Sequence, residues 1–321
     1  MSSGVFEEGW ILPIKLSYSL KEIKKNTNDS TYINSSLVYQ LKDSSWQALP
    51  VRLRVRGDNR LKNCYFPPLK VKIKKSDSKH TLFEGHKNLK IVFPCLLQKD
   101  KNDNVIKEYL AYKLFEIISP YYFKTRLLDI DFEELKSNKS KTYRLKGILI
   151  EDDKKVAKRF DGKVFDGFMH PLNQEPITSI RNAFFQYMIG NTDFSQAYQH
   201  NIKLIYINQN MIPIPFDFDM SGFVNTSYAV VSGIQGESLG TSSVTERKYR
   251  GFARDEKLLE QVRQEFINKK QEILTVLDRN ASFFDNPKEF STAREYILNF
   301  FDIIGNGGKF RSEILEQARN K

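Results

Sequence analysis

The stretch from residue 178 to residue 222 constrains the fold more than any other part of the chain, because it changes structural type within a short distance. Apolar residues recur at steps of three and four up to Met188, which predicts an amphipathic helix. Gly190 tolerates the left-handed backbone that ends helices, so we expect the helix to end there. Two apolar runs within residues 202–215 are separated by a polar turn at 208–210 and predict a hairpin.

Acidic and amide side chains flank this predicted hairpin. Asp193 and Asn201 lie in the loop before it, and Asp217 and Asp219 follow it. A loop Asp can orient an attacking hydroxyl, and carboxylate and amide oxygens hold the cation that bridges nucleotide phosphates. We therefore predict that Asp193 orients the acceptor and that Asp217, Asp219 and Asn201 bind Mg²⁺ or Mn²⁺. The alternative is a strand-end turn in which Asp219 caps the residues after it.

His200 stands beside Asn201 and has two interpretations. Histidine titrates near neutral pH, so His200 could act as a general base. Its position also suits a loop-stiffening role in which the side chain hydrogen-bonds to backbone. We favour the second interpretation, because Asp193 already supplies a carboxylate to orient the hydroxyl.

Two segments of the first half alternate apolar and basic residues, which predicts half-exposed strands. These segments are 51–56 and 69–74, and a helix is predicted over 104–118. Lys72 could be a strand lysine that binds phosphate, and Glu108 could be the helix glutamate that pairs with it. The plainer interpretation is a solvent-facing strand surface for the lysines and a helix-dipole role for Glu108.

Several of these residues resemble known motifs. Ile189–Asp193, His200-Asn201 and Pro215–Asp217 resemble the pattern of HipA-type kinases. The Asp-Phe-Asp ending, together with the stretch from Arg56 to Ile73, looks more like the CotH family of atypical kinases. The resemblance covers roughly residues 50–225.

This resemblance implies a Mg²⁺–ATP-dependent phosphotransferase that acts on a hydroxyl group of a protein substrate. It implies catalytic roles for Asp193, Lys72 and Glu108, and it places Glu151 beside the adenine. It also implies that a set of cationic side chains holds the nucleotide phosphates: Arg54, Arg56, Arg60, Lys70 and Lys72. No Gly-rich phosphate loop is present, so side chains would replace backbone amides in that role.

The fold class expected from this resemblance is α+β, a two-lobed protein-kinase-like fold. Residues 1–152 would form an N-lobe with an antiparallel sheet and one helix. Residues 153–321 would form a mainly helical C-lobe that carries the catalytic loop and the metal-binding acids. The assignment of lobes is by analogy with kinases.

Composition limits the class of protein and its partners. A hydrophobic content of 40% indicates a folded globular chain, and no apolar run is long enough to span a bilayer. The net charge of +11 allows a nucleic-acid partner, but the lysines are dispersed among acids, which favours a solvated surface with a phosphate site. The N-terminus lacks a signal-peptide pattern, so we expect a cytoplasmic protein unless a signal peptide has been removed.

Several alternatives stay open at this stage. Cys64 and Cys95 could form a disulfide or remain as two buried thiols. The missing Gly-rich loop, and the eight positions between Asp193 and Asn201, keep a pseudokinase or nucleotide-binding scaffold in view. A basic nucleic-acid-binding protein is the third class. Transfer of AMP in place of phosphate would need the same residues.

Overall fold

The computed structural model describes residues 4–7, 10–99, 101–231, 233–234 and 237–320. The chain divides into two compact units. The first contains residues 1–109 and 124–152, and the second contains 110–123 and 153–321. The main boundary therefore falls after Asp152, and residues 110–123, although earlier in the sequence, belong to the second unit.

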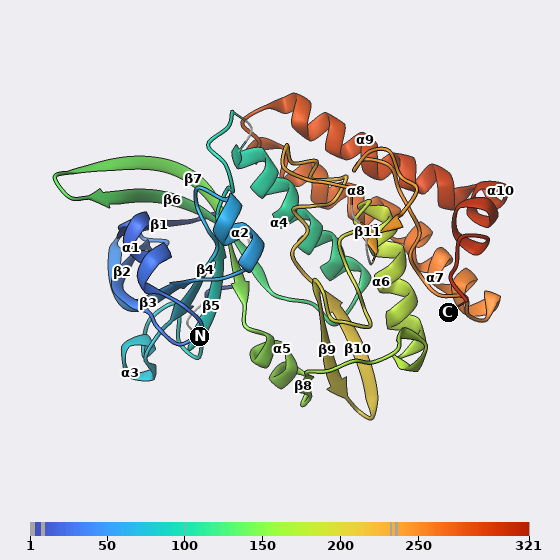
Figure 1. Cartoon of the computed structure of the whole chain (residues 1–321), viewed down its shortest axis with the longest axis horizontal. Coiled ribbons are helices and arrows are strands. Elements are labelled where there is room, and N and C mark those ends of the chain that lie inside the picture. The colour runs from blue at the N-terminus through green and yellow to red at the C-terminus, as the bar shows by residue number, and fades with distance from the viewer. Residues whose placement is uncertain (1–3, 8–9, 100, 232, 235–236, 321) are drawn as a thin grey trace. The chain divides into compact units, whose positions relative to one another are not determined.

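The first unit is built on a closed barrel in the strand order β1-β2-β3-β4-β5-β7-β6. Most neighbouring strands are antiparallel, but β1 and β6 pair in parallel from Leu12↔Leu128 to Tyr18↔Glu134 and close the ring. The β6–β7 hairpin extends beyond the rest of this unit (Figure 1). The strands are β1 Leu12–Tyr18, β2 Ile33–Gln40, β3 Trp46–Val55, β4 Leu69–Lys72, β5 Asn88–Val92, β6 Thr125–Lys136 and β7 Lys139–Glu151.

Apolar side chains at alternate positions of the strands fill the interior of the barrel. In β3, Leu49, Val51, Leu53 and Val55 are buried, while the residues between them are more exposed. Short helices connect the strands, and α4 runs from the first unit into the second at residue 110. The helices are α1 Leu20–Asn26, α2 Asp58–Asn63, α3 Lys75–Ser78 and α4 Lys101–Ile118.

The second unit combines a small sheet with a group of helices. The sheet has the order β10-β9-β8, and β9 and β10 form the predicted hairpin with Ile202 opposite Pro215. Helix α6 packs against α7, where Arg181 forms a two-point ion pair with Glu265 at 2.7 and 3.0 Å. The strands are β8 Lys163–Phe165, β9 Ile202–Ile207, β10 Asn210–Pro215, β11 Gly233–Ile234 and β12 Glu237–Ser238. The α-helices are α5 Asp153–Arg159, α6 Pro176–Met188, α7 Glu256–Asn268, α8 Lys270–Arg279, α9 Pro287–Gly305 and α10 Gly307–Phe310.

The predicted kinase-like fold is wrong. The first unit is a closed mixed barrel, not an antiparallel N-lobe sheet with one helix, and the second unit has its own sheet beside its helices. The reason lies in strand pairing over long sequence distance. Residues 12–18 alternate as a strand does, but nothing in that alternation shows that they close the barrel by pairing with residues 128–134. Local periodicity identifies a strand but not its partner.

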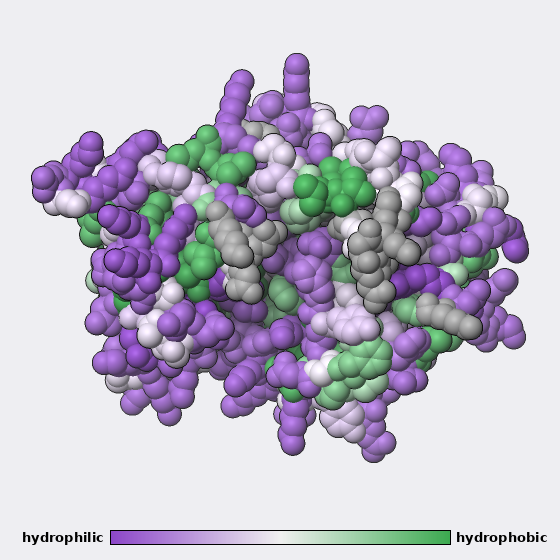
Figure 2. Space-filling model, in the orientation of Figure 1, coloured by the Kyte–Doolittle hydropathy of each residue, from purple (hydrophilic) through white to green (hydrophobic). Residues whose placement is uncertain are grey.

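The surface agrees with the composition. Figure 2 shows hydrophilic residues over most of the displayed face, interrupted by small hydrophobic patches. Among the residues that the structure describes, no helix is both long enough and apolar enough to cross a bilayer.

Candidate functional site

The loop after α6 fixes the position of Asp193. Gly190 ends the helix at a positive φ of 60°, where an added Cβ would lie 1.9 Å from the Tyr296 hydroxyl oxygen. The buried Asn191 then anchors the loop: its Nδ2 donates to Gln186 Oε1 at 2.9 Å, and its Oδ1 accepts from the Asp193 N–H at 3.0 Å.

Both oxygens of the Asp193 carboxylate are held by the next part of the loop. His200 Nε2 lies 2.9 Å from Oδ1, and Asn201 Nδ2 donates to Oδ2 at 3.0 Å. Asn201 Nδ2 also lies 2.7 Å from the Asp193 backbone carbonyl. Two of the predicted site residues, Asp193 and Asn201, are therefore in direct contact. A carboxylate fixed at both oxygens is pre-oriented for a reacting partner.

Asn201 also links this loop to the acidic residues after the hairpin. Its backbone carbonyl accepts from the Phe216 N–H at 3.0 Å, and Asp217 is the next residue. The Asp217 N–H donates to the Tyr112 hydroxyl at 2.9 Å. Asp193 and Asp217 are thus joined through Asn201 at the open end of the β9–β10 hairpin.

The backbone at this site occupies uncommon conformations. Gln199, Asn201 and Asp217 have φ values of 53°, 52° and 64°, in the left-handed region that non-glycine residues rarely adopt. Such conformations persist only where surrounding contacts enforce them, and they concentrate at functional sites. The contacts of Asn201 and Asp217 described above supply that enforcement.

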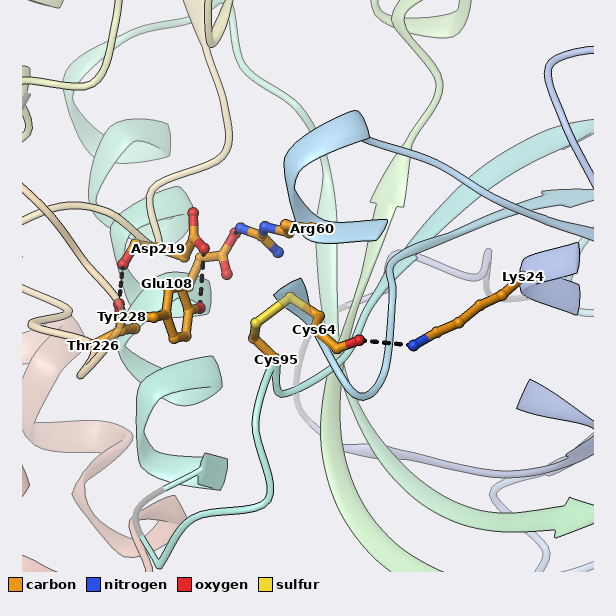
Figure 3. Close-up of a disulfide and its surroundings, with 8 residues drawn as sticks. All are labelled: Lys24, Arg60, Cys64, Cys95, Glu108, Asp219, Thr226 and Tyr228. Atoms are coloured by element: carbon orange, nitrogen blue, oxygen red, sulfur yellow. Dashed lines mark hydrogen bonds and ion pairs between the residues drawn. A yellow bond between two sulfur atoms is a disulfide. The ribbon is translucent and has the colours of Figure 1, made fainter. Parts of the chain in front are cut away.

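Asp219 lies in a different environment from Asp217. It is buried, and its Oδ2 accepts from the Tyr228 hydroxyl at 3.0 Å (Figure 3). Phe218 separates the two acids and is fully buried against Tyr112, with ring centroids 4.7 Å apart. The acids stand in a loop beyond β10, which ends at Pro215, so strand alternation does not control their directions.

The predicted metal ligands fit a cation only as part of a larger complex. Within the described ranges, no group of three or more His, Cys, Asp or Glu side chains could hold a metal ion. Mg²⁺ is usually bound by one or two carboxylates, with substrate phosphates and waters completing the coordination. Asp217 fits that pattern, and so does Asn201, whose Oδ1 is the amide atom not engaged by Asp193.

The predicted phosphate-binding cations lie on the first unit. Arg54 stands opposite Lys70, and Lys72 stands opposite Arg52, on the paired strands β3 and β4. Arg54 forms an ion pair with Asp29 at 2.8 Å. Lys72 Nζ lies 5.6 Å from the Tyr32 ring centroid. The phosphate-binding role of Arg54, Arg56, Lys70 and Lys72 stays a prediction.

Glu108 and Glu151 are both buried in the first unit. The Glu108 carboxylate lies 3.7 Å from the guanidinium of Arg60 (Figure 3), so its described ion pair is with Arg60, while Lys72 lies over a tyrosine ring. The Glu151 carboxylate accepts from the Lys124 N–H at 3.2 Å. Burial favours such pairing, because an isolated buried charge is costly.

Lys90 was missed by sequence reasoning, and the structure changes the interpretation of His200 and Arg250. Lys90 is buried in β5, and a lone lysine inside the apolar run LKIV was its only signal. The His200 ring contacts the Asp193 carboxylate, and it is the His200 backbone that pairs with Ser195, whereas the expectation was a side chain bonded to backbone. Arg250 is one of three basic residues within 247–250 that the sequence suggests for contact with an acid or phosphate of the substrate, and it is buried beside the cavity that Asp193 lines.

The contact between His200 and Asp193 should make the stability of the folded protein depend on pH. The hydrogen bond to Asp193 raises the pKa of His200 above its ordinary value of 6.5; desolvation opposes this shift, and the charges of Asp193 and Asp217 add to it. A raised pKa means that the charged pair stabilises the folded state fully below pH 6.5 and loses that contribution as pH rises through the folded pKa. The melting-temperature gap between wild type and His200→Gln should therefore be widest at low pH and close at high pH.

The pKa itself can be measured by NMR titration of the His200 ring. Asp193→Asn should move the pKa back toward its ordinary value, since it removes the main cause of the shift. A wild-type His200 pKa at or below 6.5 would contradict the described geometry.

A comparison with protein-family models gives no match to this chain, and a search of curated proteins finds no similar sequence.

Proposed function

We propose that this protein transfers the terminal phosphoryl group of Mg²⁺-bound ATP to a hydroxyl group of a protein. One observation carries the proposal. Asn201 donates its side-chain amide to the Asp193 carboxylate, and its backbone carbonyl accepts from the residue before Asp217. For this reaction, a hydroxyl-orienting acid and a metal-binding acid must lie near each other. Asn201 connects the two acids through its side chain and its backbone.

The reaction assigns a defined step to Asp193. The acceptor oxygen forms a bond to the γ-phosphorus while the bond from that phosphorus to the β–γ bridging oxygen breaks, and ADP leaves. The hydroxyl proton passes to the Asp193 carboxylate. His200 and Asn201 hold that carboxylate in one orientation, so little reorganisation is needed when the acceptor arrives.

Asp217 and the Oδ1 atom of Asn201 are the groups that would hold the cation. When bound, the cation neutralises charge that develops on the transferred phosphoryl group. Asp217 is kept in place by the hydrogen bond from its N–H to Tyr112 and by the packing of Phe218. Asp219, bound by Tyr228, has a supporting role in fixing the loop.

A thermal-shift measurement with ATP, with and without Mg²⁺, tests the proposal. A ligand that binds only the folded state raises its melting temperature, by roughly 5–10 °C for a domain of this size at about 100 times Kd. We expect this shift to require Mg²⁺ and to disappear in Asp217→Asn. Asp166→Asn is the matched control, because Asp166 is an exposed acid of the same unit with a long contact of 3.7 Å to Lys203.

The outcomes separate the competing functions. Absence of any shift at saturating ATP would overturn the proposal. A Mg²⁺-dependent shift without phosphate transfer or ATP hydrolysis would indicate a nucleotide-binding protein without transfer activity. An equal shift in Asp217→Asn would remove this residue from the metal site.

A further inference from the structure

The second unit contains a cavity of about 540 Å³ directly beside Asp193. Three segments distant in sequence form its walls: residues 168–171, residues 192–200 and residues 250–252. Arg319 joins them because the C-terminal segment lies along residues 251–253, with the Arg319 N–H donating to the Gly251 carbonyl at 3.0 Å. A volume of this size lies within the range of roughly 300–1,000 Å³ that encloses small ligands.

Two arginines give the cavity its charge. Arg250 is 9% exposed and donates Nη1 to the Thr192 carbonyl, while Arg319 donates Nη2 to the Arg250 carbonyl. Both bond to backbone carbonyls, which are neutral. In the part of the chain that the structure describes, neither guanidinium forms an ion pair with a carboxylate, and neither buried Nε atom has a hydrogen-bond partner.

The buried Arg250 and the half-buried Arg319 are not directly paired with an anion. Burial, together with the nearby charge of Arg319, lowers the pKa of Arg250 to about 10, and the charge of Asp193 opposes the shift. Asp193 itself is already bound at both oxygens by His200 and Asn201. A buried charge without a paired anion is costly, so an anion entering the cavity would gain strong, charge-assisted hydrogen bonds.

Aromatic side chains form another part of the wall. Phe168 and Tyr198 are 58% and 71% exposed, and their ring centroids lie 5.2 Å apart. Large aromatic side chains exposed next to each other are typical of surfaces that bind proteins or peptides. Apolar and cationic walls in one cavity suit a short peptide segment that carries both apolar and acidic side chains.

We propose that this cavity binds the acceptor polypeptide through an anionic side chain, which pairs with Arg250 and Arg319 next to the acceptor hydroxyl at Asp193. The inference rests on the proposed function, since that function requires a hydroxyl-bearing protein. The size of the cavity limits the contact to a few residues, so the anion lies close in sequence to the acceptor hydroxyl. An aromatic or aliphatic neighbour packs on Phe168 and Tyr198. The anion is a carboxylate or a phosphate already present on the chain.

Binding of defined peptides without nucleotide tests this site. Fluorescein-labelled peptides with one serine and one phenylalanine carry two Glu, two Gln or two phosphoserine residues on one side of the serine. In a second set of peptides, the same residues stand on the other side of the serine. Both sets are needed because the direction in which a bound peptide runs through the cavity is not fixed. Fluorescence polarisation should show at least roughly tenfold tighter binding of an anionic peptide than of its Gln counterpart. The Glu and phosphoserine arms identify the source of the anion.

Three variants test whether Arg250 and Arg319 cause the preference for anionic peptides. Arg250→Gln and Arg319→Gln should both lose the preference for anionic peptides. Lys248→Gln should keep it, because Lys248 donates to Gln317 at 2.8 Å and does not line the cavity. Arg250 is buried and holds the Thr192 carbonyl, so its variant could fold poorly; Arg319→Gln, at a less buried position, tests the same point independently.

Equal affinity for anionic and Gln peptides, or a preference that survives in Arg319→Gln, would overturn the inference. Lack of binding of every peptide at about 1 mM would do the same. Failure of peptide binding can be distinguished from failure of phosphoryl transfer, because the peptide assay contains no nucleotide. A lost ATP shift with a retained anion preference would refute phosphoryl transfer and leave the anion site standing.

Discussion

Asp193→Asn is expected to reduce phosphoryl transfer from Mg²⁺–ATP by roughly 10²–10⁴-fold, the range associated with a positioned acid or base group. The asparagine keeps the size of the side chain but cannot accept the hydroxyl proton. It also loses the charge that attracts His200, whose Nε2 lies 2.9 Å from Oδ1. Transfer can be followed with γ-labelled ATP, using water and the protein itself as acceptors.

The control for this experiment must separate chemistry from folding. Asp166→Asn changes an exposed acid of the same unit and should leave the rate unchanged. The Asp193→Asn protein should also retain the Mg²⁺–ATP thermal shift, since Asp217 and Asn201 are intact. An unchanged rate in Asp193→Asn would remove Asp193 from the reaction. Label incorporated from α-labelled ATP would instead indicate AMP transfer.

Removal of the disulfide between Cys64 and Cys95 is expected to lower the free energy of unfolding by about 3–4 kcal/mol. The two Cα atoms lie 4.5 Å apart and the residues are separated by 31 positions, so the bridge closes a loop of that length. Cross-linking reduces the conformational entropy of the unfolded chain, and a loop of this size gives that magnitude in the chain-entropy account.

The measurement is urea unfolding of the oxidised protein and of the Cys64→Ser/Cys95→Ser double variant, each with and without a reductant. Reductant should destabilise the wild type to the level of the variant and leave the variant unchanged. Two nearby hydrogen bonds do not involve the sulfur atoms: Lys24 Nζ donates to the Cys64 carbonyl at 2.9 Å (Figure 3), and the Tyr65 N–H donates to the Cys95 carbonyl at 2.8 Å. Wild-type stability that does not respond to reductant would show that the bridge is absent in solution.

Elements that depend on neighbouring residues could be predicted from the sequence. The helix ending before Gly190 and the hairpin at 202–215 follow from apolar periodicity and from residues that tolerate turns. The strands around Val51 and Leu69 follow from their strict alternation. In each case the side chains within a few residues determine which faces are buried.

Elements that depend on distant partners were mispredicted. Residues 12–18 close the barrel through a parallel pairing that no local pattern encodes. The kinase-like fold failed for this reason.

The candidate site shows the same division. Helix and strand signals in the sequence are enough to predict that Asp193 and Asn201 lie in the loop before the hairpin and that Asp217 follows it. Only the tertiary structure decided that Asn201 joins the two acids, that Asp219 turns to Tyr228, and that Arg250 lies beside Asp193. Hydrogen bonds and charge pairing between residues far apart in the chain depend on packing, and packing depends on the whole fold.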